Sequence, residues 1–124
     1  MNYGFIPKEG KTKKPTYGEV ELTIKEDGRK VWMLPEGYYD ILLKQGIDMK
    51  DRYKGYFKTR SSVIRCNAVV RSGLFDAGFK TEHGGCFLKV ENPIEIEYGA
   101  RVAQFLVTET DVVENLYNGQ WQNK

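Results

Sequence analysis

Short runs of alternating apolar and polar residues, separated by turn residues, constrain the fold of this chain more than any other feature. Between Thr16 and Lys25, the apolar residues Val20, Leu22 and Ile24 alternate with polar ones, which is the period of a half-buried strand. Further strands are expected at residues 30–34, 38–43, 53–59, 68–75, 86–91, 94–98 and 101–108. This rhythm predicts an all-β sandwich or jelly roll.

Helices are expected to contribute little. Residues 60–65 favour a single helical turn, with Ser61 or Ser62 as its N-cap, and residues 111–116 are a second short candidate. The strands must therefore supply most of the core.

The length of 124 residues and the 40% hydrophobic content suit one domain. We expect a flexible basic N-terminal arm at residues 1–16, a β domain at 17–116 and a C-terminal tail at 117–124. The arm carries a lysine cluster, and solvation is favoured over contact with a polyphosphate or nucleic acid. A net charge of +2 also gives no reason to expect a nucleic-acid partner.

The chain has only two cysteines, Cys66 and Cys86, and one histidine, His83. This set excludes a conventional zinc site and the zinc-dependent deaminases, so both thiols are expected to be reduced. No run approaches the roughly 20 apolar residues that a membrane helix needs, and the N-terminal residues do not resemble a secretory signal. We therefore expect a soluble, intracellular protein with no membrane partner.

Two segments carry candidate chemistry. Arg60, Ser61, Ser62 and Arg65 offer guanidinium and hydroxyl donors suited to phosphate oxygens, although solvated arginines on a surface turn are an alternative. Asp76 lies in the mainly apolar sequence LFDAGF, where partial desolvation would favour a general base. Its alternative is a turn aspartate that bonds its own backbone.

Four motifs occur in the order typical of the dUTPase and dCTP deaminase superfamily. RSSVIR (residues 60–65) resembles its phosphate-binding motif, LFDAGF (74–79) its catalytic hairpin and GARVAQFLV (99–107) its G-x-R-I-A-Q-L motif. The tail from Tyr117 to Gln122 resembles its last motif, and LPEGYY (34–39) resembles a strand of compact archaeal and viral members. The resemblance covers about residues 32 to 124.

This resemblance implies a dUTPase-like distorted jelly roll, or β-clip, that assembles into a homotrimer. Active sites would lie between subunits, and the tail would close over the ligand. The ligand would be the small-molecule nucleotide dUTP, with Mg²⁺ bound through its triphosphate and no dedicated protein metal ligands. The expected location is the cytoplasm, or the host cytoplasm if the protein is viral.

The resemblance also assigns residue roles for the hydrolysis of dUTP to dUMP and pyrophosphate. Asp76 would activate the water that attacks the α-phosphate, Gln104 would help to place that water or a phosphate oxygen, and Phe79 would pack against the deoxyribose. As alternatives, Gln104 is a solvent-facing strand residue and Phe79 a core residue. The substrate-binding set would be Arg60, Ser61, Ser62 and Arg65 for the phosphates, the backbone of Gly73, Leu74 and Phe75 for the uracil, and Tyr117, Gln120 and Trp121 for the lid.

Two departures from the family pattern keep other functions open. Lys89 occupies the position where deaminases place a proton-shuttling glutamate, unless a shifted register brings Glu82 or Glu91 there. The first dUTPase motif has no match before Leu34. The alternatives are therefore a dCTP deaminase, which Lys89 disfavours, and a non-catalytic deoxynucleotide-binding or regulatory protein.

Overall fold

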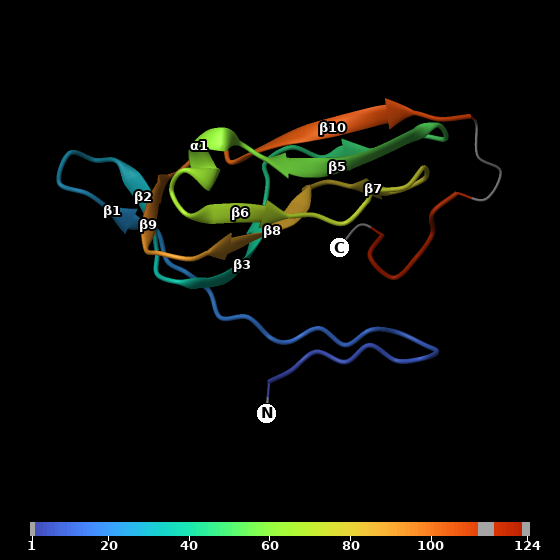
Figure 1. The fold of residues 1–124 in the computed structure, drawn as a ribbon, viewed down its shortest axis with the longest axis horizontal. Coiled ribbons are helices and arrows are strands. Elements are labelled where there is room, and N and C mark those ends of the chain that lie inside the picture. Colours follow the sequence, from blue (N-terminus) through green and yellow to red (C-terminus); the bar gives the residue numbers. More distant parts are fainter. Residues whose placement is uncertain (1, 112–115, 123–124) are drawn as a thin grey trace.

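The computed structural model describes residues 2–111 and 116–122 and has the expected all-β architecture (Figure 1). Within the described residues, the regular elements are ten short strands and one helical turn. The strands are β1 (Thr23–Ile24), β2 (Lys30–Leu34), β3 (Gly37–Leu42), β4 (Ile47–Asp48), β5 (Tyr53–Thr59), β6 (Ala68–Arg71), β7 (Lys80–Thr81), β8 (Gly85–Val90), β9 (Ile94–Glu97) and β10 (Ala103–Glu109), and the turn is α1 (Ser61–Ile64). The described residues include no helix with the length and apolar character needed to span a bilayer.

The strands form four antiparallel groups, in the orders β1-β2-β9, β3-β8-β6, β10-β5 and β4-β7. In the central strand β8, every second residue is buried against the core, with Cys86, Leu88 and Val90 at most 2% exposed. This period of two follows from strand geometry, in which successive side chains point to opposite faces. The outward face of β8 carries Phe87 and Lys89.

The strand pair β5–β10 positions both halves of the candidate site. Phe57 and Phe105 face each other in register and pack with ring centroids 4.8 Å apart. Gly55 must be a glycine, because a Cβ there would lie 2.7 Å from the Phe105 ring. Along its other edge, β5 exchanges two backbone hydrogen bonds with Phe75, and the Phe57 amide donates to Ser72 Oγ.

The expected strand from Thr16 to Lys25 is wrong over most of its length. Only Thr23–Ile24 pairs with β2, and the side chains of Val20 and Ile24 are 40% and 69% exposed. Upstream, Tyr17 packs against Phe87 of β8, so the chain leaves β2 for another sheet. An alternating pattern predicts a face to bury but does not specify the strand that will cover it.

Other strand boundaries also differ from expectation. The predicted strand 68–75 ends at Arg71, because the next residues leave β8 and bond to β5. The two-residue strands β4 and β7 were not predicted, since two residues are too few to display a period. The remaining predicted strands are confirmed, with β2 and β5 exact and the ends of the others shifted by at most two residues. The predicted helix at 111–116 falls mostly on residues 112–115, which lie outside the described residues.

Candidate functional site

The segment RSSVIR lies where β5 ends and α1 begins. The N-cap of α1 is Arg60, with extended φ and ψ of −69° and 143°, so the prediction that Ser61 or Ser62 caps the helix was wrong. The backbone stays extended because the Arg60 amide still donates to the carbonyl of Val102, at 3.3 Å, beside β10. Both serines are exposed, and neither side chain caps the turn, which leaves their hydroxyls open to a ligand.

The motifs RSSVIR and GARVAQFLV meet at this end of the molecule. Arg60 Nη1 donates to the carbonyl oxygen of Arg101 at 3.1 Å, and Arg65, which follows α1, is exposed nearby in the chain. Gln104 lies in β10 opposite Lys58 of β5, on the solvent-facing side of the pair. The structure therefore brings Arg60 to the segment that contains Gln104.

The LFDAGF hairpin joins β5 near its other end. Phe75 pairs with Gly55 through hydrogen bonds of 3.0 and 2.7 Å, and Asp76 follows directly. The Phe79 amide closes the turn by donating to the carbonyl of Asp76 at 3.1 Å. Gly73 and Leu74, the other residues expected near the uracil, are exposed on the approach to this turn.

The Asp76 side chain is half-buried, and its carboxylate makes no hydrogen bond or ion pair with any described residue. The alternative in which this carboxylate bonds its own backbone is therefore not seen. A carboxylate with unused lone pairs at the edge of an apolar turn can accept a hydrogen bond from water.

Phe79 lies inward of this turn, in the cluster that also contains Met49 and Phe57. Its side chain is 5% exposed, and its ring contacts those of Phe75 and Tyr117 at centroid distances of 5.0 and 5.4 Å. This position supports the core alternative considered for Phe79. A contact with the sugar remains a prediction.

The C-terminal tail docks on the hairpin of its own chain. The Tyr117 amide donates to the carbonyl of Ala77 at 2.7 Å. Gln122 then donates from Nε2 to the carbonyl of Gly78 and accepts from the amide of Lys80 through Oε1, both at 3.0 Å. The sequence motif did not indicate that the Gln122 side chain helps to attach the tail to the hairpin.

The Gln120 side chain contacts the N-terminal segment, whereas the sequence motif assigned it to the ligand-binding lid. Its side-chain amide bonds both the amide and the carbonyl of Thr12, at 3.1 and 2.8 Å. The N-terminal segment, which forms a loop closed by paired bonds between Phe5 and Lys13, thus contacts the tail (Figure 1). Trp121 donates its backbone amide to the Tyr117 hydroxyl, and its side chain is 36% exposed.

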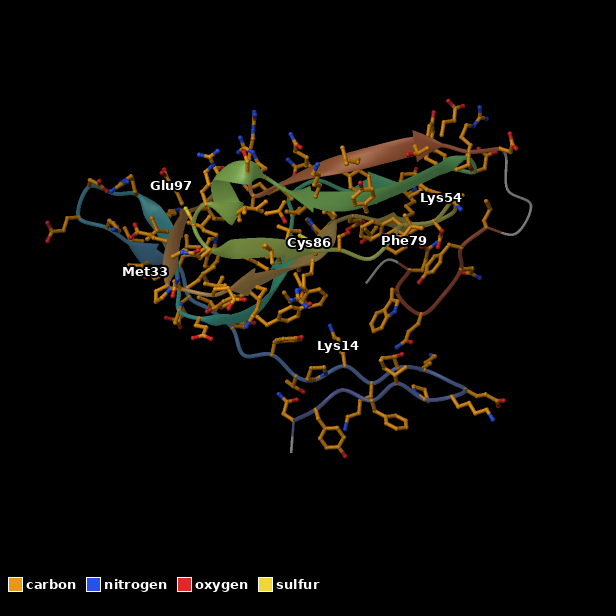
Figure 2. All side chains as sticks on the ribbon, viewed as in Figure 1. Lys14, Met33, Lys54, Phe79, Cys86 and Glu97 are labelled. Carbon is orange, nitrogen blue, oxygen red and sulfur yellow. The ribbon has the colours of Figure 1, made fainter. Side chains whose placement is uncertain are left out.

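The two halves of the candidate site lie apart within one chain. Asp76 follows the residue paired with Gly55, whereas Arg60 is five residues further along the extended chain. At about 3.3 Å per residue this is roughly 16 Å. Figure 2 places Phe79 near the end of the molecule where Lys54 lies, away from α1. A general base must come within about 3 Å of its target, so one chain does not bring both halves to one phosphate.

Within the described residues, no three histidine, cysteine or acidic side chains converge on a possible cation site. On the outward face of β8, Lys89 is flanked by Tyr38 of β3 and Val69 of β6. No glutamate therefore lies directly opposite Lys89 on either neighbouring strand.

Comparisons with known proteins agree with these motifs. A family model described as dCTP deaminase-like matches residues 3–110. A probable deoxyuridine 5'-triphosphate nucleotidohydrolase of Methanosarcina mazei is 33% identical over 80% of this chain and 60% of its own length. A protein of the same description from Halobacterium salinarum is 35% identical over 71% of this chain and 52% of its own length. The deoxyuridine 5'-triphosphate nucleotidohydrolase of Methanocaldococcus jannaschii is 29% identical over 92% of this chain and 70% of its own length.

Proposed function

Because this chain belongs to the dCTP deaminase-like family, we propose that it hydrolyses dUTP to dUMP and pyrophosphate. The curated relatives named above carry deoxyuridine triphosphate nucleotidohydrolase names, although this chain spans only 60% and 52% of the first two. The observation that carries the proposal is the half-buried Asp76 carboxylate, which no described side chain neutralises.

Asp76 is the general base of the proposed reaction. It accepts a proton from a water molecule as that water attacks the α-phosphorus, and the bond from the α-phosphorus to the bridging oxygen breaks. Pyrophosphate leaves and dUMP remains. Gln104 orients the water or a phosphate oxygen, and Phe79, held between Phe75 and Tyr117, supports the hairpin from the core.

The proposed site forms between subunits of a homotrimer. Arg60, Ser61, Ser62 and Arg65 of one subunit hold the phosphates, and Asp76 of a neighbouring subunit reaches the α-phosphate. The separation of roughly 16 Å between these halves along β5 supports this arrangement, since a second copy can supply the missing half. Tyr117 and Trp121 of the tail contact the base and sugar in this proposal, and the docking of the tail on the hairpin supports that role.

Magnesium fits this donor set as a partner of the substrate. The phosphate-binding residues are cationic or neutral, so the ion would be held by phosphate oxygens and water. When bound, it would neutralise phosphate charge and favour departure of pyrophosphate.

Deamination of dCTP is the competing activity within the same family. It requires a carboxylic acid to move protons at the cytosine ring, and Lys89 occupies the expected position on β8. An ammonium group has no acceptor lone pair while it is charged. The dUTPase reaction needs no group at that position, which favours it over deamination.

The first test uses the whole chain with Mg²⁺ and separate samples of dUTP, dCTP, dTTP and UTP. Pyrophosphate and nucleoside monophosphate are measured, together with ammonia from dCTP, and Asp76→Asn runs in parallel. We expect pyrophosphate from dUTP, lowered by at least about 100-fold in Asp76→Asn. A rise in melting temperature with dUTP but no product would instead identify a binding protein, and ammonia from dCTP would identify a deaminase.

A further inference from the structure

Lys58 lies directly across β5–β10 from Gln104, on the solvent-facing side of the pair. We infer that Lys58 is a further phosphate-binding residue of the triphosphate site. The inference rests on the proposed function, because it assigns one more cation to the subsite of Arg60 and Gln104. Sequence motifs gave no indication of this, since Lys58 precedes RSSVIR and is joined to Gln104 only by strand register.

The alternation of buried and exposed residues along β5 shows that Lys58 faces solvent. Gly55 and Phe57 are buried, whereas Lys54, Tyr56 and Lys58 are exposed. Arg60 follows two positions after Lys58 with extended backbone angles, so both cations belong to the same face. Directly opposed residues in an antiparallel pair have Cβ atoms about 4.5–5.5 Å apart, which places Gln104 beside Lys58.

No described residue forms an ion pair with Lys58. Gln104, Leu106 and Tyr56 around it on the outward face are neutral, and Arg60, two positions along the chain, is itself a cation. The Arg60 guanidinium, in contrast, is partly held by the carbonyl of Arg101. A flexible ammonium beside a fixed guanidinium and a side-chain amide suits a bound polyphosphate.

Lys54 provides an internal comparison. It is exposed on the same face of the same strand, but it lies opposite Thr108 and four residues from Lys58. That distance is about 13 Å along the strand. Lys54 therefore matches Lys58 in residue type, strand and exposure while lying outside the reach of a phosphate held at Arg60.

The test compares Lys58→Gln and Lys54→Gln with the unsubstituted chain. Binding of inorganic pyrophosphate in the presence of Mg²⁺ is measured by calorimetry, and KM and kcat are measured with dUTP. We expect Lys58→Gln to weaken pyrophosphate binding and to raise KM by about tenfold, with kcat changed less than about threefold. Lys54→Gln should leave each value within about twofold of the original, and melting temperatures verify folding of both.

The outcomes separate this inference from the proposed function. Equal pyrophosphate affinity in Lys58→Gln and Lys54→Gln would overturn the role of Lys58 even if dUTP is hydrolysed. Pyrophosphate binding that depends on Lys58, in a protein that does not hydrolyse dUTP, would support the anion site and overturn the enzymatic proposal. A chain that neither binds pyrophosphate nor hydrolyses dUTP would overturn both.

Discussion

Tyr117 packs edge-on against Phe79, with ring centroids 5.4 Å apart and planes 63° from parallel. The same tyrosine donates its backbone amide to the carbonyl of Ala77, and its hydroxyl accepts from the amide of Trp121. Tyr117 thus helps to fix the tail to the hairpin and also covers an aromatic ring of the core. Tail docking and hairpin order are therefore coupled.

Replacing Tyr117 with alanine should release the tail and destabilise the fold. Edge-to-face aromatic pairs contribute about 0.5–1.5 kcal/mol beyond area burial, and the lost burial adds to this. We expect a drop of about 2 kcal/mol in the free energy of unfolding, measured by urea denaturation, and faster limited proteolysis after residue 111. Tyr117→Phe keeps the ring and should lose less than half as much. Equal loss in both variants would assign the effect to the hydroxyl instead.

Gly78 should not tolerate a side chain. Its φ is +95°, and a Cβ would lie 2.5 Å from Leu116 Cβ and 2.6 Å from the Tyr117 amide nitrogen. Gly78→Ala should therefore lower the free energy of unfolding by about 1–3 kcal/mol and displace the tail. Gly28→Ala is the matched control, since Gly28 also has a positive φ, +88°, but a Cβ there meets no atom within 4 Å. Similar stability in the two variants would contradict the docked tail.

Gln122 should protect a specific backbone amide. Its Oε1 accepts from the Lys80 amide and its Nε2 donates to the Gly78 carbonyl. Gln122→Ala should accelerate hydrogen exchange at Lys80 by about tenfold. Gln122→Glu retains the acceptor and should preserve protection at Lys80 while losing the bond to Gly78. Unchanged exchange at Lys80 in Gln122→Ala would show that this contact does not persist in solution.

Mixed oligomers test the proposed site between subunits. Arg60→Ala and Asp76→Asn should each be inactive, but a neighbouring pair can combine the intact Arg60 of one subunit with the intact Asp76 of another. Random exchange of subunits at equal amounts should restore about a quarter of the original activity. A site formed within one chain would give no recovery, because every subunit lacks one of the two groups.

The Asp48–Lys50 ion pair, in the turn before the hairpin, should make the free energy of unfolding depend on pH in the acid range. A hydrogen bond from the Lys50 side chain lowers the pKa of Asp48 from 3.8, and the Lys50 carbonyl accepts from the Gly78 amide. A lowered pKa stabilises the fold fully above the unfolded pKa, and this contribution is lost as the pH falls through the folded value. The urea midpoint should therefore fall less between about pH 5 and pH 2 in Asp48→Asn than in the original chain. The difference should be small because the pair is exposed.

Local patterns in the sequence predicted most of the longer strands and the chemistry-bearing segments. A period of two depends only on the order of residues, so β2, β3, β5, β8, β9 and β10 could be predicted to within one or two positions. RSSVIR and LFDAGF could be recognised as units because each occupies adjacent positions. Family membership follows from the same local strings.

The tertiary structure alone decided how these parts face one another. Alternation specifies which side of a strand is buried but not which strand pairs with it. The sequence therefore could not show that residues 16–22 do not pair with β2. Strand register places Lys58 beside Gln104 and separates Asp76 from Arg60. The side-chain amides of Gln120 and Gln122 can bond almost any backbone group, and only the folded chain assigns one to Thr12 and the other to the hairpin.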